Sequence, residues 1–399
     1  MTAGALAGLR VLELNHFAAA PYCTKLLAGS GAQVIKIEPP TGDPLRAVAP
    51  FKNGVTHPET GATHLFLNAG KQSVTLDAVT GEGRSLLLRL IEQADVLVTD
   101  WEPALLDSRA LDYAALERVN PRLVMTAISF FGRTGPYRDY VANELIGFAM
   151  GGYQFITGQP CRPPVKVGGN VGQYQGGLHA VTGTMAAVLH QQFTGQGQLV
   201  DVSISEALAF AAGAMTRWMN TGALSRRTGN RADRDKPQAL YPSTTLPCKD
   251  GWVHVHAAPS GFELLPVLME EPRLADPAIA AAPFGHADLI DELCAPWLSR
   301  HTRAEAVALA QELRHPFAEV LDIPEVLADP QHAARGYLVD VEHPVAGTVR
   351  QPGAPYVSTE TPWETRRAPL LGEHTNTVLS ELLGCTPDDL RALRERRVI

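Results

Sequence analysis

The sequence predicts an α/β protein whose larger part is a doubly wound parallel sheet. Within the first 130 residues, short runs rich in apolar side chains alternate with stretches of helical periodicity. Strands separated by helices of about 10–15 residues are typical of a parallel sheet with helices on both faces. The right-handed crossover between parallel strands then favours the doubly wound arrangement. A polar, glycine-containing stretch between Thr221 and Gln238 further predicts that a smaller unit follows the sheet.

The expected elements follow from local periodicity. Short apolar runs predict strands over residues 10–14, 33–38, 73–77, 95–99, 123–129 and 200–204. Helices are expected where apolar residues recur every three or four positions, which is the period of one helix face. These stretches cover residues 20–27, 81–94, 111–119 and 176–193.

Composition excludes several classes of protein. Apolar residues make up 45% and charged residues 19% of the 399 residues, so the chain can build a large core and is not disordered. The formal net charge of −8 argues against nucleic acid as a partner, because phosphate binding usually needs a basic face. The five cysteines form no C-x-x-C pair, so neither a metal site nor a disulfide framework is expected. Without a run of about 18 apolar residues, we expect no membrane association and a cytoplasmic location.

Common catalytic signatures are absent from the sequence. It contains no Walker loop, no G-x-S-x-G elbow and no H-E-x-x-H motif. Two segments rich in glycine or proline are more informative. Residues 39–44 follow a predicted strand, where loops of an open parallel sheet face the ligand crevice. Residues 168–173 precede the longest predicted helix. Glycines there would let a ligand approach the backbone, and the amino end of the helix favours an anion. The same glycines are also explained if they only allow tight packing at the start of the helix.

A series of motifs in one order covers nearly the whole chain. They are residues 8–13, 16–21, 34–39, 42–44, 68–73, 94–98, 120–122, 135–137, 194–198, 201–203, 329–331, 334–336 and 367–375. By these motifs the sequence resembles the family III CoA-transferases (the CaiB/BaiF family), which include formyl-CoA transferase, carnitine CoA-transferase and alpha-methylacyl-CoA racemase. The most specific match is the C-terminal series, residues 329–331, 334–336 and 367–375 (RAPLLGEHT).

The resemblance implies a Rossmann-like large domain formed by both ends of the chain, a smaller inserted domain and an interlocked dimer. On this basis residues 1–220 and 331–399 are assigned to the large domain, 221–240 to a linker and 241–330 to the small domain. The resemblance also implies coenzyme A or an acyl-CoA thioester as ligand, a carboxylate as second substrate, and no metal. The second subunit is either another copy of this chain or a paralogue.

The resemblance places the CoA-binding residues within the first 110 positions. They are His16, Phe17, Ala18, Lys71, Asp100, Trp101 and Arg109. Lys71 matches a family lysine that contacts CoA, whereas Asp100 and Trp101 stand where Asn and Phe are usual. Pro39 replaces an arginine of some members, and Arg109 lies one place after the usual arginine. We therefore expect a weakened grip on the phosphates of CoA.

Of the two assigned catalytic positions, Gln173 and Glu144, the first departs from the family pattern. Family transferases use an aspartate just before the helix that corresponds to residues 176–193. Its carboxylate attacks the thioester carbonyl and passes through an anhydride to an aspartyl-CoA thioester. Gln173 occupies that position, and a neutral amide is a very poor nucleophile, although it can form a hydrogen bond with a thioester oxygen. Glu144 matches the supporting glutamate of formyl-CoA transferase, and Asn143 stands where family racemases have a histidine.

Three interpretations stay open from the sequence. In the first, the chain binds a CoA ester and acts in CoA transfer beside a paralogous subunit that carries the nucleophile. In the second, it is an acyl-CoA enzyme of different, isomerase- or racemase-like chemistry that uses Glu144 as base and Gln173 to hold the substrate. In the third, it is a non-catalytic acyl-CoA-binding protein. Whether the chain is itself an enzyme, for instance through an unrecognised carboxylate, and which acyl group and acceptor it takes are left open.

Overall fold

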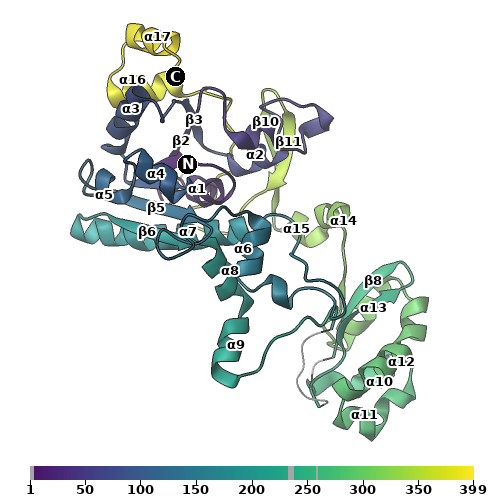
Figure 1. Cartoon of the computed structure of the whole chain (residues 1–399). Coiled ribbons are helices and arrows are strands. Elements are labelled where there is room, and N and C mark those ends of the chain that lie inside the picture. Colours follow the sequence, from purple (N-terminus) through teal and green to yellow (C-terminus); the bar gives the residue numbers. More distant parts are fainter. Residues whose placement is uncertain (1–3, 232–237, 258) are drawn as a thin grey trace. The chain divides into compact units, whose positions relative to one another are not determined.

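The computed structural model describes residues 4–231, 238–257 and 259–399, so residues 232–237 of the expected linker lie outside the described residues. Backbone contacts divide the chain into two units. The first contains Met1–Tyr153, Val167–Met215 and Gln331–Ile399, and the second contains Gln154–Lys166 and Thr216–Pro330. Figure 1 labels many of the helices and strands of both units.

The first unit is built on a six-stranded sheet in which all neighbouring strands run parallel. The strands are β1 (Arg10–Leu14), β2 (Gln33–Glu38), β3 (Gln72–Thr75), β4 (Val96–Thr99), β5 (Val124–Ser129) and β6 (Gln198–Ser203). Their order, β3-β2-β1-β4-β5-β6, is that of doubly wound dinucleotide-binding sheets. Each of the six expected strands is present, and the predicted α/β class is confirmed.

The helices of the first unit connect and cover these strands. They are α1 (Ala19–Gly29), α2 (Ala62–Leu67), α3 (Gly81–Ile91), α4 (Pro103–Ser108), α5 (Tyr113–Leu116), α6 (Glu144–Met150), α7 (Val171–Thr194), α8 (Ile204–Ala212), α16 (Thr375–Leu383) and α17 (Pro387–Glu395). The helix expected over residues 111–119 is shorter than predicted, since only α5 forms there. A hairpin of β10 (Leu338–His343) and β11 (Gly347–Pro352) also belongs to this unit.

Two apolar cores lie on opposite faces of the sheet. Successive residues of a strand point to opposite faces, so the side chains of β1 divide between the cores. Leu12 and Leu14 belong to the core that contains residues of α3, α16 and α17. Val11 belongs to the core that contains residues of α1, α7 and α8. Helices from both ends of the chain therefore cover the sheet.

Helix α7 begins at Val171, five residues before the predicted start at Gly176. The prediction was wrong because the glycine-rich residues 168–172 resemble a loop, whereas a distant carboxylate, that of Glu144, caps the helix. Gly177 brings α7 close to α1, since a Cβ at this position would lie 2.7 Å from the backbone oxygen of Ala19.

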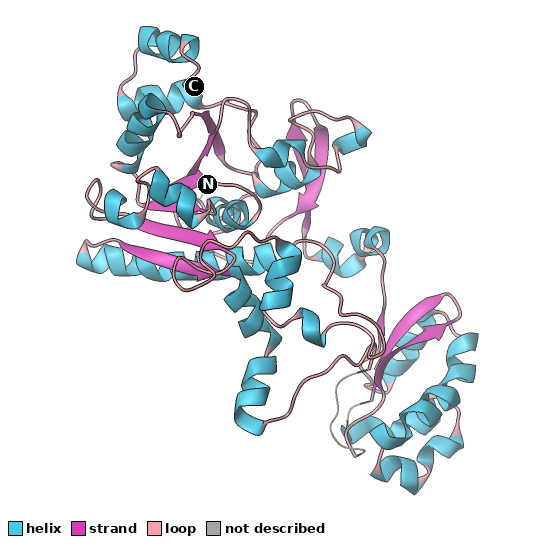
Figure 2. Cartoon of the chain, viewed as in Figure 1, coloured by secondary structure: helices cyan, strands magenta, loops and turns pink. Residues whose placement is uncertain are grey.

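The second unit combines a small antiparallel sheet with helices (Figure 2). Its strands are β7 (Ser243–Cys248), β8 (Gly251–His256) and β9 (Ala318–Glu319). Four helices pack or connect around them: α10 (Leu265–Leu268), α11 (Pro277–Ala281), α12 (Ala287–Arg300) and α13 (Arg303–Glu312). α14 (Ile323–Ala328) also belongs to this unit, as does most of α9 (Ala214–Thr221), whereas α15 (Pro330–Ala334) belongs to the first unit except for Pro330. In the part of the chain that the structure describes, no helix combines the length and the hydrophobicity needed to cross a membrane.

Candidate active site

The carboxyl ends of β1 and β4 lie side by side at the centre of the sheet. The two strands pair in parallel up to Leu14 and Thr99. β2 and β3 lie on the side of β1, and β5 and β6 lie on the side of β4, so the strand order reverses between β1 and β4. Ligands of open α/β sheets bind in the crevice at such a point. Residues 15–18 after β1 and residues 100–102 after β4 flank this crevice.

A cavity of about 130 Å³ opens at this position. Its walls come from the segments after β1, β4 and β5, from residues 138–142, and from the first turns of α7 and α8. Four residues that the sequence singled out, His16, Phe17, Asp100 and Gln173, line it together. Phe17 and other aromatic residues line it together with charged and polar side chains such as Asp100 and Arg138. Aromatic walls that carry polar groups are typical of a small-molecule site.

A second cavity of about 240 Å³ lies beside the ends of β1, β2 and β3 and shares His16 with the first. Trp101 lines it, and its indole nitrogen donates a hydrogen bond to the backbone oxygen of Asn15 at 3.2 Å. The acidic residues Glu38 and Asp77 also line it, and none of the described residues in its lining is Lys or Arg. A ligand group in this cavity would therefore have no lysine or arginine side chain of the lining to pair with.

Gln173 lies in the first turn of α7, where Glu144 supplies the cap. The backbone N–H groups of Gly172 and Gln173 donate to the two carboxylate oxygens of Glu144 at 2.7 and 3.2 Å. A carboxylate at the amino end of a helix satisfies donors that have no partner within the helix and complements the helix dipole. Gly172 gives it room, since a Cβ there would lie 3.1 Å from Oε2 of Glu144. Gln173, only 5% exposed, is thereby held at the cavity wall by its backbone.

Asp100 lies between the two loops of the crevice. Its carboxylate accepts hydrogen bonds from the backbone N–H groups of His16 at 2.5 Å, Phe17 at 3.4 Å and Ala20 at 3.2 Å. Burial raises the pKa of this carboxyl, and the three backbone donors act in the opposite direction. Asp100 thus connects the end of β4 to the loop after β1 and to the start of α1.

Beneath the crevice, a network of buried charges joins β1 and β2. The carboxylate of Glu13 accepts from the ammonium groups of Lys36 at 2.8 Å and Lys71 at 2.7 Å, and Lys36 also pairs with Asp43 at 2.5 Å. Burial alone would raise the pKa of Glu13, but the charges of Lys36 and Lys71 outweigh it and lower this pKa to about 2. Burial lowers the pKa of Lys71 to about 8, although Glu13 acts against this.

A second part of the network ties the end of β2 to the C-terminal segment. Arg46 pairs with both oxygens of Glu38, at 2.7 and 2.8 Å, and with Glu59 at 2.7 Å. The other oxygen of Glu59 accepts from the backbone N–H of Leu371 at 2.9 Å. Burial acts to raise the pKa of Glu38, but hydrogen bonds from Arg46 and other nearby groups lower it to about 2. Residues that gave the family resemblance in 34–39 and 367–375 are therefore part of one buried ionic structure.

The remaining predicted site residues lie apart from the first cavity. Lys71 is 4% exposed, and its ammonium donates to Glu13, to the backbone oxygen of Pro21 and to Asn68, so its three hydrogens have acceptors. Arg109 is exposed and donates to the backbone oxygen of Val79 at 3.1 Å; Val79 lines the second cavity. Ala18 is buried at the N-cap of α1. Their roles toward CoA stay predictions.

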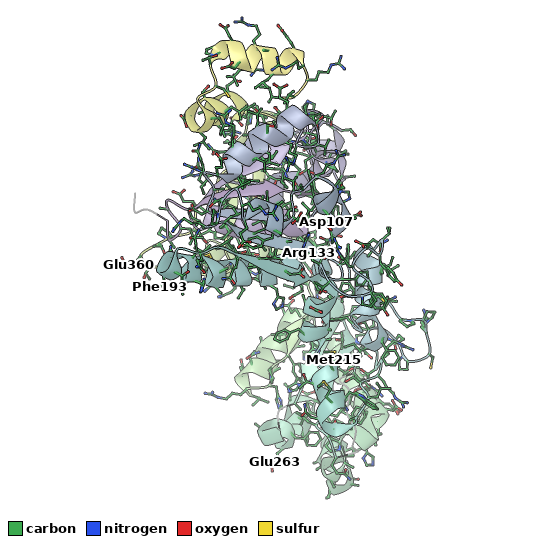
Figure 3. The ribbon with its side chains drawn as sticks, turned by 60° about the vertical axis from the view of Figure 1, so that its left-hand side comes forward. Asp107, Arg133, Phe193, Met215, Glu263 and Glu360 are labelled. Atoms are coloured by element: carbon green, nitrogen blue, oxygen red, sulfur yellow. The ribbon has the colours of Figure 1, made fainter. Side chains whose placement is uncertain are left out.

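Sequence reasoning missed several residues of the first cavity. Ser129, at the end of β5, lines it, and its buried hydroxyl has no hydrogen-bond partner among the described residues. Ser129 could have been predicted as a site residue, because it ends the expected strand 123–129 and the carboxyl ends of parallel strands face the ligand crevice. Arg138 also lines the cavity and shares the carboxylate of Asp107 with Arg133, which pairs at 2.9 Å; Figure 3 labels Asp107 and Arg133. No local pattern indicated this ion pair.

Comparison with known proteins agrees with the resemblance seen in the sequence. The family model described as CoA-transferase family III matches residues 6–375. A succinyl-CoA–D-citramalate CoA-transferase from Chloroflexus aurantiacus is 36% identical over 401 residues, covering 98% of this chain and 97% of that protein. The beta and alpha subunits of a succinyl-CoA–L-malate CoA-transferase from the same organism are 32% and 31% identical; each alignment covers 99% of this chain, and 98% and 92% of those proteins.

A solved structure is also similar over most of the chain. A CaiB/BaiF family protein from Brucella suis superposes with a TM-score of 0.85 at 29% sequence identity, covering 96% of this chain and 100% of that one. The fold expected from the sequence is thus shared with a protein of known structure.

Proposed function

The chain belongs to CoA-transferase family III, and on this premise we propose that it binds a CoA thioester at the carboxyl end of its sheet. It acts in the transfer of CoA between an acyl-CoA and a carboxylate, as a subunit without a nucleophile of its own. In its active assembly a paralogous subunit carries the aspartate. The large domain that both chain ends form, the inserted smaller domain and the interlocking of two subunits belong to the same proposal.

The observation that carries the proposal is the position of Gln173. Gln173 lies in the first turn of α7, where its backbone N–H donates to Glu144. It also lines the cavity where the loops after β1 and β4 meet. The site therefore retains the support for a catalytic side chain, while the side chain itself is an amide that cannot attack a thioester. An amide can still hydrogen-bond to the thioester oxygen and so help to orient it.

Glu144 is an unsuitable replacement for the missing carboxylate. Both of its oxygens accept backbone N–H groups, from Gly172 and Gln173, so the whole carboxylate is engaged in capping α7. This argues against the alternative in which Glu144 performs isomerase-like proton transfer. A heteromeric assembly has a parallel among the relatives, which include alpha and beta subunits of one transferase.

We assign the nucleoside end of the CoA ester to the cavity beside Trp101 and the thioester end to the cavity beside Gln173, because the two share His16. Trp101 offers an aromatic surface fixed by its bond to Asn15, and Arg109 lies next to Val79 at the edge of that cavity. To reach a phosphate, Lys71 would have to break its ion pair with Glu13. We therefore assign Lys71 a structural role, in which it supports β1 beneath the ligand.

The test combines binding with trapping of a covalent adduct. Calorimetry with CoA and a panel of acyl-CoA esters should show binding by the chain alone. Treatment with acyl-CoA and then hydroxylamine or borohydride should leave the peptide that contains Gln173 unmodified, with Gln173→Asp as the matched positive control. Transfer activity should appear when a family paralogue with aspartate at this position is co-expressed. Absence of binding to every ester, or an adduct at position 173 of the unaltered chain, would refute the proposal.

A further inference from the structure

Helix α1 begins without a capping side chain of its own. Its N-cap residue is Ala18, whose methyl group accepts no hydrogen bond. The first turn of a helix nevertheless leaves backbone N–H groups without partners, and oxygen atoms of polar side chains usually satisfy them. Here the acceptor comes from another strand, since Asp100 follows β4 and accepts from Ala20 in the first turn of α1.

The carboxylate of Asp100 does more than cap one N–H. It also accepts from His16 and Phe17, so three backbone donors of the loop and helix converge on one anionic group. The amino end of a helix together with neighbouring backbone N–H groups is the arrangement that binds phosphates in many α/β proteins. In this chain a side chain of the protein occupies that position.

We propose that Asp100 is a positioning residue that acts as a built-in anion at the start of α1. It holds the backbone of His16 and Phe17 at the wall of the cavity that contains Gln173. It also denies this helix end to a phosphate of the ligand, because a second anion there would meet both a filled site and a like charge. The role of Asp100 in ligand binding rests on the proposed function, whereas its role as an anion at the start of α1 does not.

The chain offers a matched control at the other end of the same strand. Asp95 immediately precedes β4, and among the described residues its carboxylate accepts one backbone N–H, that of Arg10, at 2.8 Å. It lies at the amino end of the strand, away from His16 and Phe17, and it caps none of the described helices. Replacing Asp95 thus removes a carboxylate that bonds to the backbone without creating a free helix end.

The first experiment measures amide hydrogen exchange in Asp100→Asn and Asp95→Asn. The asparagine keeps the size of the side chain, but its NH₂ group cannot accept a hydrogen bond, so at least one of the three donors loses its partner. We expect exchange of at least one of the amides of His16, Phe17 and Ala20 to become roughly tenfold faster in Asp100→Asn, and exchange of all three to stay unchanged in Asp95→Asn. Unchanged exchange in Asp100→Asn would overturn the proposal.

The second experiment uses Asp100→Ala, which empties the position, with inorganic phosphate and formate as probes. We expect either anion at millimolar concentration to raise the unfolding temperature of Asp100→Ala, and to have no such effect on the unaltered chain or on Asp95→Ala. If Asp100→Ala folds and neither anion stabilises it, the helix end is no anion site and the proposal fails. If Asp100→Ala does not fold, the exchange measurement on Asp100→Asn decides.

A third measurement concerns the ligand. Where the unaltered chain binds acetyl-CoA, Asp100→Asn should weaken that binding about tenfold and Asp95→Asn should not, while formate should restore affinity to Asp100→Ala. Equal affinity of Asp100→Asn and the unaltered chain would remove the positioning role. If the unaltered chain binds no CoA ester, the proposed function fails, but the exchange and anion results still decide whether Asp100 is the built-in anion.

Discussion

The pair of Arg46 and Glu38 provides a quantitative test of the buried network. The guanidinium and the carboxylate form two parallel hydrogen bonds, and their side chains are 3% and 0% exposed. Substitution Arg46→Met keeps a side chain of similar length and removes the charge. It leaves the carboxylates of Glu38 and Glu59 buried without their guanidinium partner.

The expected magnitude follows from the pKa of Glu38. A lowering from 4.5 to about 2 corresponds to roughly 3 kcal/mol of unfolding free energy. Breaking a buried pair by removing one partner typically costs about 3–5 kcal/mol, so we expect a loss of this size at neutral pH. Because the pKa of Glu38 is lower in the folded state, its contribution is present above its ordinary pKa and is lost as the pH falls toward about 2.

Urea unfolding followed by circular dichroism over a range of acid to neutral pH measures this effect. The difference between the unaltered chain and Arg46→Met should be largest near neutrality and should shrink as acid protonates Glu38. The control is Arg350→Met, which removes an equally bidentate but exposed pair with Asp340 and should change the unfolding free energy little. A difference for Arg46→Met that is small, or that stays constant with pH, would refute the reasoning.

Three further predictions concern the site. Gln173→Asp should give weak CoA transfer, detected by mass spectrometry of CoA esters, because a misplacement of about 1 Å costs on the order of a hundredfold in rate; full turnover would contradict this. Gly172→Ala should displace the carboxylate of Glu144, since the new Cβ would lie 3.1 Å from Oε2, and should lower both the unfolding temperature and acyl-CoA affinity. Lys71→Met should lower the urea unfolding free energy by about 3 kcal/mol, because Glu13 then keeps only Lys36 as cationic partner; an unchanged midpoint would contradict the network.

The central strands were predictable because their side chains are apolar on both faces. Glu13 and Lys36 interrupt these apolar runs, and a charge inside a buried strand must be paired, so their partnership was open to inference. The caps were not predictable from local pattern. Glu144 caps α7 and Asp100 caps α1 across long stretches of sequence, and no periodicity or spacing signals a contact of that kind. Resemblance to a family identified their positions without their contacts.

The attachment of the C-terminal segment to the buried network has a consequence for biosynthesis. A ribosome delivers β1 to β6 long before residues 367–375, yet the side chains of Glu59 and Ser73 accept hydrogen bonds from the backbone N–H groups of Leu371 and Gly372. α16 and α17 likewise complete the core on one face of the sheet. The nascent chain therefore carries a half-covered sheet with incompletely satisfied ionic groups until residues 367–375, α16 and α17 have been synthesised. The sheet thus completes its core late in synthesis, in contrast to chains whose amino-terminal domain folds fully before the rest is made.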